Sequence, residues 1–339
     1  RFLAINKFIL FNSTKIMNNL NFINNKYKNY LKINLPYKNN IILNQTNCDI
    51  CNKKNFSLIT EYSLLNSKNK KYIYFPYVFC NNCGNAQQLF KLNKKFYNDY
   101  YNLLVSRSLT KKVNIKRLSN SVLRGKILLN FLEKKLKVKF KNQNVLDIGC
   151  GHGGMLLEFY KKGCTVSGSD PDKKSIQFTK KKYRFLNLKV SDAENLKEKK
   201  NFYDLIIING SLEHVYDPNI VMKKVSYFLK NNGYLYLEGK GYPLDKKENF
   251  FNFSHQRIFN DGSFTNLCSK NKIFKIYSSY NNPMNVLKLS FSSKFHGKNK
   301  KSTSQRGNLC WIGIKKTKKN KVKLKKDFFF KNFFNLNIN

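Results

Sequence analysis

Residues 144–156, NVLDIGCGHGGML, constrain the fold of this chain more than any other stretch. The apolar residues before Gly149 are typical of a buried strand, and the glycines that follow let the backbone turn sharply and approach a ligand closely. We expect a helix to begin near Met155. A strand, a glycine turn and a helix start together predict a nucleotide-sized site. The spacing of Gly149, Gly151 and Gly154 also fits a dinucleotide fingerprint, so the flanking residues must decide between ligands.

Strand and helix patterns alternate beyond the glycine turn, which predicts a parallel sheet with crossover helices. We expect further strands at 165–168, 187–190, 203–208 and 234–238, and a closing antiparallel pair at 272–278 and 308–315. A helix over 219–230, capped by Asn231 to Gly233, should precede the strand at 234–238. The expected fold class is therefore α/β, with a Rossmann-like, seven-stranded, doubly wound sheet.

Polar side chains stand where the predicted strands end. Asp170 lies about 20 residues beyond Gly149, where a carboxylate can accept hydrogen bonds from both hydroxyls of a ribose. Asp192 and Ala193 follow the next strand, and Asn209 follows the one after it. Because the carboxyl ends of parallel strands meet at one edge of a sheet, these are candidate cofactor-binding residues.

Two C-x-x-C pairs precede the sheet, Cys48 with Cys51 and Cys80 with Cys83. Four thiolates in paired spacing can bind zinc in a closed, tetrahedral, structural site. With every ligand position filled by protein, the metal would stabilise a small zinc-ribbon-like module without taking part in chemistry. Four unrelated thiols or a redox pair are the alternatives, and the paired spacing favours zinc.

Glu213 and His214 follow the predicted strand at 203–208, at the edge where a site must lie. His214 is the first candidate for a general base or for orienting an acceptor, because imidazole titrates near neutral pH. The alternative is that Glu213 and His214 only brace the loop by hydrogen bonds. His255 is a further catalytic candidate that fits a structural role equally well. Cys150 has no base beside it in sequence, so we expect a lining residue and no nucleophile.

These residues resemble class I methyltransferases that use S-adenosylmethionine (SAM). The resemblance rests on the run from Asp147 to Gly153, in which an acidic residue stands two places before the first glycine. A dinucleotide-binding turn usually has an apolar residue there. The resemblance implies that the loop of Gly149, Cys150, Gly151 and Gly153 lies along the amino-acid part of SAM. It also implies that Asp170 holds the ribose and that Asp192 with Ala193 meets the adenine. Carboxylates suit SAM, because it carries an ammonium and a sulfonium and no pyrophosphate.

The cysteine pairs, Leu212-Glu-His214, Asp217-Pro218 and Phe253-Ser-His255 are similar to a bacterial subgroup of these enzymes. Its members join an N-terminal zinc-binding module to a SAM methyltransferase domain. Many of them serve surface-polysaccharide, modified-sugar or other secondary biosynthesis. The resemblance therefore implies an enzyme that methylates a small molecule, a sugar or a nucleotide-linked sugar.

The predicted organisation has five parts. They are a poorly ordered extension (1–47), the zinc-binding module (48–100), a helical linker (101–142), the SAM methyltransferase domain (143–315) and a basic, aromatic tail (316–339). Within the linker, apolar residues recur at helical spacing over 114–138, so a helix should lead into the main domain.

The formal net charge of +45 raises the question of a nucleic-acid partner. Lysine is spread over the whole length together with abundant Asn, Ile, Tyr and Phe, so we attribute the charge mainly to biased composition. An RNA methyltransferase is nevertheless the second candidate function. A non-catalytic scaffold in a ribonucleoprotein is the third, and the set of Asp147, Asp170 and Asp192 argues against it.

No apolar run is long enough to span a membrane. The paired cysteines suit a reducing compartment, so we expect a cytoplasmic protein. Residues 1–47 contain no Asp or Glu, which makes an organellar matrix location with a presequence the alternative. We favour Met17 as the true start, with residues 1–16 as an upstream or truncated extension.

Overall fold

The computed structural model describes residues 2–4, 44–45, 47–66, 71–91, 94–95, 97–98, 111–240, 255–280 and 308–316. Nearly all of the predicted extension and tail lie outside these residues, as does the first part of the linker. Phe253 and Ser254 of the 253–255 motif also lie outside them.

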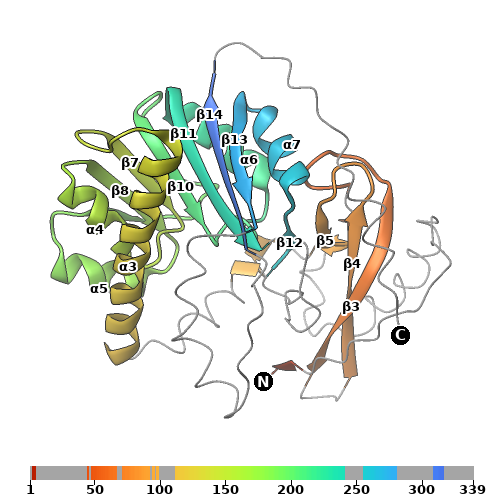
Figure 1. The fold of residues 1–339 in the computed structure, drawn as a ribbon. Coiled ribbons are helices and arrows are strands. Elements are labelled where there is room, and N and C mark those ends of the chain that lie inside the picture. Colours follow the sequence, from red (N-terminus) through yellow and green to blue (C-terminus); the bar gives the residue numbers. More distant parts are fainter. Residues whose placement is uncertain are drawn as a thin grey trace, which may run out of the picture.

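A seven-stranded sheet forms the centre of the described structure, in the order β13-β14-β11-β10-β7-β8-β9 (Figure 1). Its strands are β7 (Asn144–Ile148), β8 (Thr165–Asp170), β9 (Asn187–Val190), β10 (Tyr203–Asn209), β11 (Leu229–Lys240), β13 (Ile273–Ser279) and β14 (Asn308–Lys315). The strands from β11 across to β9 are parallel to their neighbours, and β14 is antiparallel to both β11 and β13. The predicted α/β fold, with a mostly parallel sheet and a closing antiparallel pair, is confirmed.

Helices cover both faces of this sheet, as Figure 1 shows. They are α3 (Lys111–Leu136), α4 (Gly154–Lys161), α5 (Lys173–Lys182), α6 (Pro218–Phe228) and α7 (Asp261–Ser269). Successive strand residues enter different cores, because side chains alternate across a strand. Val145 and Leu205 pack with α3, α4 and α5, whereas Leu146 and Ile206 pack with α6 and α7. The apolar runs of the parallel strands are therefore buried on both sides.

Helix α3 packs closely against the start of α4. A Cβ atom at Gly125 would lie 2.5 Å from the carbonyl oxygen of Met155, so only glycine allows this approach. Ser121 of α3 also accepts a hydrogen bond from the backbone N–H of Met155, at 3.0 Å. The linker helix thus satisfies one of the free N–H groups at the start of α4. It lies directly beside the glycine turn.

The boundary between α6 and β11 differs from the prediction. The helix ends at Phe228, and Leu229 already has an extended backbone and is fully buried. Leu229 pairs with Tyr203, but the next pair is Tyr234 with Leu205, so the residues between form an irregularity in the strand. Asn232 there adopts a left-handed φ of 62°. The predicted cap is therefore a bulge inside β11, because burial of Leu229 starts the strand early.

A second, antiparallel sheet has the order β1-β3-β4-β5-β12. Its strands are β1 (Phe2–Ala4), β3 (Phe56–Asn66), β4 (Lys71–Cys80), β5 (Ala86–Gln88) and β12 (Arg257–Ile258), and the short strands β2 (Asn44–Gln45) and β6 (Phe90–Lys91) pair separately. It lies beside α7 in Figure 1. Strand β12 comes from beyond β11 in the chain, so this small sheet includes residues far outside the predicted 48–100 module. Its apolar residues join the same core as α6 and α7.

Candidate active site

The glycine turn between β7 and α4 is tied to the end of β8. The backbone N–H groups of Gly149 and Cys150 both donate to the carbonyl oxygen of Ser169, at 2.8 and 3.0 Å. Gly149 and Gly151 have φ angles of 78° and 55°, which side chains other than glycine rarely adopt. A Cβ atom at Gly151 would meet nothing within 4 Å, so the turn faces open space there.

Asp170 closes this turn from the end of β8. Its carboxylate accepts hydrogen bonds from the backbone N–H groups of Gly151 and Asp172, both at 2.8 Å. Burial raises the pKa of Asp170, and the two N–H groups oppose that effect. A carboxylate has about four acceptor positions, so Asp170 retains capacity for ligand hydroxyls.

Asp147 is buried in β7, shortly before the glycine turn in the sequence. Neither of its oxygens has a hydrogen-bond partner within the described part of the chain. Burial, reinforced by the charge of Asp170, raises the pKa of Asp147 to about 8, and Arg124 works in the opposite direction. A buried carboxylate without a partner is costly unless a cation compensates it. The site therefore suits a positively charged ligand group.

Asp192 and Ala193 follow β9 at the same edge of the sheet. Asp192 accepts hydrogen bonds from the backbone N–H and the side-chain amide of Asn195, at 2.7 and 2.8 Å. These bonds hold the turn after β9. Ala193 is partly buried and packs against the core that contains Leu196.

Asn209 ends β10 and bonds Arg124, which in turn pairs with Glu238. Neither Arg124 nor Glu238 was predicted as a site residue. The amide oxygen of Asn209 accepts from Arg124 of α3 at 3.0 Å, and its amide nitrogen lies 3.4 Å from the sulfur of Met155. Arg124 also pairs with Glu238 at the end of β11, at 3.4 Å. The rule that selected Asp170, a carboxylate at the carboxyl end of a strand, could have found Glu238. No local pattern marks Arg124, because it reaches the edge from a helix.

Cys150 is buried in the turn and belongs to the same apolar core as Leu156 and Leu188. Burial raises its pKa well above the ordinary value, with the charges of Asp147 and Asp170 adding to the effect. The thiol therefore stays protonated at neutral pH. A protonated thiol is a poor nucleophile.

The structure brings Glu213, His214 and His255 together although they come from two distant segments. Potential ligand atoms of the three residues all lie within 4.8 Å of one another, and the two imidazole rings have centroids 5.0 Å apart. The side chain of Glu213 is 2% exposed, and its Oε2 has no hydrogen-bond partner among the described residues. Such a cluster can exchange a proton with an acceptor, and its atoms also offer a set of metal ligands.

The four predicted zinc ligands also meet. The sulfurs of Cys48 and Cys83 are 3.5 Å apart, those of Cys51 and Cys80 are 3.4 Å apart, and all four lie within 4.8 Å of one another. Sulfur atoms of a tetrahedral zinc site are separated by roughly 3.8 Å when each Zn–S bond is about 2.3 Å. A hydrogen bond from Cys48 lowers the pKa of Cys80. The donor set and its spacing therefore fit zinc, and none of the four is in a disulfide.

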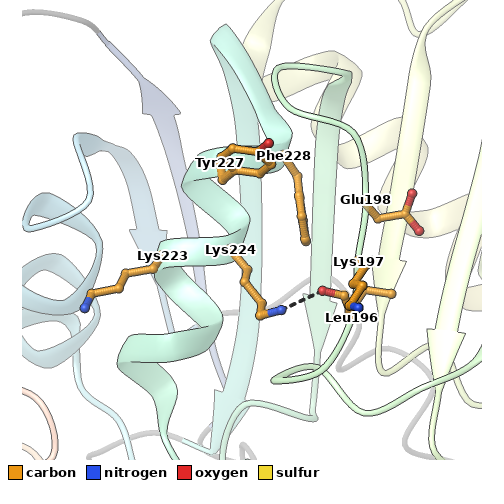
Figure 2. Close-up of a pocket in the computed structure, with 7 residues that line it drawn as sticks. All are labelled: Leu196, Lys197, Glu198, Lys223, Lys224, Tyr227 and Phe228. Atoms are coloured by element: carbon orange, nitrogen blue, oxygen red, sulfur yellow. Dashed lines mark hydrogen bonds between the residues drawn. The ribbon is translucent and has the colours of Figure 1, made fainter.

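A pocket of about 310 Å³ lies elsewhere, between α6 and the segment after β9 (Figure 2). Lys224 donates to the carbonyl oxygen of Leu196 across it, at 2.8 Å. The carbonyl oxygen of Phe228, at its wall, accepts from the N–H of Phe202 just before β10. The pocket thus lies toward the amino ends of the parallel strands, away from Asp170, Asn209 and Glu213.

The central part of the chain is similar to known methyltransferases. Residues 120–271 match a family model described as a methyltransferase domain. Ubiquinone biosynthesis O-methyltransferase from Pelagibacter ubique (strain HTCC1062) is 38% identical over 116 residues, which cover 33% of this chain and 48% of that protein. Pavine N-methyltransferase from Thalictrum flavum subsp. glaucum is 33% identical over 102 residues, 28% of this chain and 29% of that protein.

Solved structures include a SAM-dependent methyltransferase from Methanosarcina mazei, which is 20% identical with a TM-score of 0.41 and covers 52% of this chain and 94% of that one. The chain spans about half, or less, of the length of the curated relatives it matches. None of the described helices is long and apolar enough to cross a membrane.

Proposed function

We propose that this chain, which carries a SAM-dependent methyltransferase domain, transfers a methyl group from SAM to a small-molecule acceptor, a sugar or a nucleotide-linked sugar. The observation that carries the proposal is the unpartnered carboxylate of Asp147, buried beside a glycine turn that Asp170 closes. A cationic ligand with a ribose satisfies both carboxylates.

The cofactor side follows from these contacts. Asp147 and the turn from Gly149 to Gly153 would face the amino-acid part of SAM, where an ammonium compensates the buried carboxylate. Asp170 would hold the ribose, and Asp192 with Ala193 would meet the adenine. Asn209, fixed by Arg124, would line the same edge. When bound, SAM supplies an electrophilic methyl group on its sulfonium.

On the acceptor side, we assign acid–base chemistry to His214, with Glu213 and His255 as its partners. His214 would take the proton of the acceptor group while the acceptor atom forms its bond to the methyl carbon and the bond from that carbon to the sulfonium breaks, with the electron pair left on sulfur as a neutral thioether. Glu213 is buried and has a carboxylate oxygen within 4.8 Å of a ring nitrogen of His214, so it can hold the imidazole in one orientation. Water exclusion and alignment supply most of the remaining acceleration in a displacement of this kind.

The proposed acceptor class rests on the combination of the cysteine cluster with the methyltransferase domain. The curated relatives are named for ubiquinone and alkaloid methylation, so a phenolic hydroxyl is the second candidate acceptor. We also assign zinc to the four-cysteine cluster, as a structural metal. Its four ligands leave no position for substrate.

Calorimetry with SAM tests the cofactor assignment. The wild-type chain should bind SAM, and Asp170→Ala should weaken binding roughly 10- to 100-fold, since bonds to a charged group contribute about 1.5–3 kcal/mol each. Asp204→Ala is the matched control. Asp204 lies near the amino end of β10, at the opposite edge of the sheet from Asp170, so its loss should leave the affinity for SAM unchanged. A wild-type chain that does not bind SAM contradicts the proposal.

A methyl-transfer panel with radiolabelled SAM tests the acceptor. Nucleotide-linked sugars, free sugars, a catechol and total RNA are offered to the same preparation. We expect label in the sugar samples. Label in RNA, together with a complex that survives physiological salt, would instead support the RNA methyltransferase.

A further inference from the structure

The small sheet and its cysteine cluster contact the segment that carries Glu213 and His214. We call residues 211–217 the acceptor loop. Its backbone carbonyls at Leu212, Val215 and Tyr216 all accept hydrogen bonds from one side chain, that of Arg257 in β12. A loop whose carbonyls converge on a single guanidinium has its backbone path fixed by that group.

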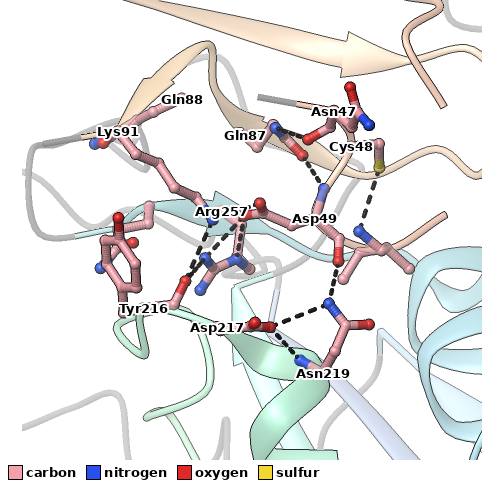
Figure 3. Close-up of polar contacts among 12 residues, drawn as sticks. Asn47, Cys48, Asp49, Gln87, Gln88, Lys91, Tyr216, Asp217, Asn219 and Arg257 are labelled. Carbon is pink, nitrogen blue, oxygen red and sulfur yellow. Dashed lines mark hydrogen bonds and ion pairs between the residues drawn. The ribbon is translucent and has the colours of Figure 1, made fainter. Parts of the chain in front are cut away.

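Arg257 is anchored in turn by Asp49, which lies between the cysteines of the first pair. Its Nε and Nη2 donate to Asp49 Oδ2 at 3.1 and 2.9 Å (Figure 3). The Arg257 side chain is 0% exposed and that of Asp49 is 6% exposed. A buried ion pair of this kind is strongly destabilised when one partner is removed, because the other charge is left without compensation.

The remaining atoms of Asp49 are also engaged. Lys91 donates to its Oδ1 at 2.5 Å, its backbone N–H donates to Gln87, and its carbonyl accepts from the side chain of Asn219 at 2.7 Å. Figure 3 shows these contacts converging on Asp49 from β5, from β6 and from the start of α6. Asp49 therefore links the cysteine pair to both ends of the acceptor loop.

His255 is held from the same side. Strand β12 pairs with β5, and the N–H of Gln88 donates to the carbonyl of Gln256 at 3.0 Å. The hydroxyl of Tyr77 in β4 donates to the carbonyl of His255 at 2.8 Å. The side chain of Gln256 reaches the carbonyl of His214, also at 3.0 Å. Both histidines thus depend on backbone that the small sheet fixes.

We infer that Asp49 and Arg257 are positioning residues for the acceptor side, and that they couple the integrity of the four-cysteine cluster to the geometry of the His214–His255 pair. This inference rests on the acceptor-side role proposed for the two histidines. Asp49 can hold Arg257 only while the turn between Cys48 and Cys51 keeps its shape. Loss of that shape releases the three carbonyls of the acceptor loop together.

The test uses imidazole NMR signals of the full chain, which has only four histidines. Single His→Gln variants assign them. In Asp49→Asn, the signals of His214 and His255 should shift or double while that of His152, which is bonded to Asn114 beside the glycine turn, stays in place. Amides of the acceptor loop should exchange at least about tenfold faster, a factor equivalent to about 1.4 kcal/mol. Chelation of the wild-type metal should move the same two signals.

Glu198→Gln is the matched control, because Glu198 is also a buried carboxylate, 7% exposed, that pairs with a lysine outside this network. It should leave both histidine signals unchanged. Lys91→Met removes the hydrogen bonds from Lys91 to Asp49 and to the carbonyl of Tyr216 but retains the Arg257 contact. It should shift both signals in the same direction by less, and it decides the matter if Asp49→Asn does not fold. Signals and exchange rates that match the wild type, or a control that moves them equally, overturn the inference. SAM binding is measured on the same samples, so a failure of the proposed function would appear separately, as a wild-type chain without affinity for SAM.

Discussion

The proposed cofactor side and the proposed acceptor side of this protein are built in different ways. The cofactor side comes from successive strand ends, and short backbone hydrogen bonds tie the glycine turn to Ser169 and Asp170. The acceptor side comes from three distant segments, at 48–51, 211–217 and 255–258, which a buried ion pair and a strand pairing hold together. The proposed cofactor side thus depends on neighbouring strands of one sheet, whereas the proposed acceptor side depends on segments from both sheets.

This difference predicts that damage to one side leaves the other intact. The two sides meet at the sheet edge, where the hydroxyl of Ser211 donates to the carbonyl of Ile148. Most of their polar support nevertheless differs, because Arg124 serves Asn209 whereas Arg257 serves the acceptor loop. Substitutions at residues that share no partner usually have additive effects.

Loss of the cysteine cluster is expected to have the largest effect. Cys80→Ser should remove one bound zinc per chain and lower the free energy of unfolding by more than about 5 kcal/mol, because structural zinc contributes on the order of 10 kcal/mol. Metal analysis and thermal unfolding measure both quantities. Cys164→Ser, a buried cysteine outside the cluster, should keep the metal. A folded, metal-free wild-type protein would refute the zinc assignment.

Replacing the proposed base, His214, should have the next largest effect, and it should change activity without changing SAM binding. Once the methyl-transfer panel has identified an acceptor, His214→Gln should lower kcat roughly 10²- to 10⁴-fold, the range of general-base catalysis, without weakening SAM binding. His255→Gln should lower it less. Steady-state kinetics and calorimetry test this pair. An equal loss of SAM affinity in His214→Gln would mean that the sides are not independent.

Asp147→Asn tests the cofactor side through pH. The pKa of Asp147 lies near 8 in the folded chain, above its ordinary value of 3.8, so the folded state holds the extra proton. Its contribution to stability is therefore fully present below about pH 4 and is lost as the pH rises through about 8. The asparagine variant should lack this decline in stability between about pH 4 and pH 8, yet bind SAM roughly 10- to 100-fold more weakly. A variant that binds SAM as well as the wild type contradicts the role of Asp147.

Arg124→Met should have the smallest effect. Arg124 opposes the rise in the pKa of Asp147, so its removal should raise that pKa further and shift the stability profile to higher pH. Because Arg124 is 39% exposed, we expect a change in SAM affinity of less than about tenfold. Thermal unfolding across pH and calorimetry measure the two changes. An unchanged profile would show that Arg124 supports only Asn209 and Glu238.

The sequence predicts the main sheet well because its signals are local. Apolar runs, glycine spacing and strand-end carboxylates all lie within a few residues of the features they predict. The predicted end of α6 was wrong by two residues, because the burial of Leu229 overrides the turn signal of Asn231 to Gly233. Arg124, Asp49 and Arg257 stayed unpredicted for a different reason. Their partners lie far away in the chain, and no spacing rule connects Asp49 with Arg257.

Strand β12 also sets an order of events during synthesis. All four cysteines are outside the ribosome once residue 83 has emerged. The small sheet gains its last strand only after residue 258 has emerged. Until then the edge of β5 is open, and open edges invite pairing with other chains. An engineered transfer of residues 48–91 to another protein would carry that open edge with it. A graft that also includes residues 255–258 closes the edge and brings Arg257 to Asp49.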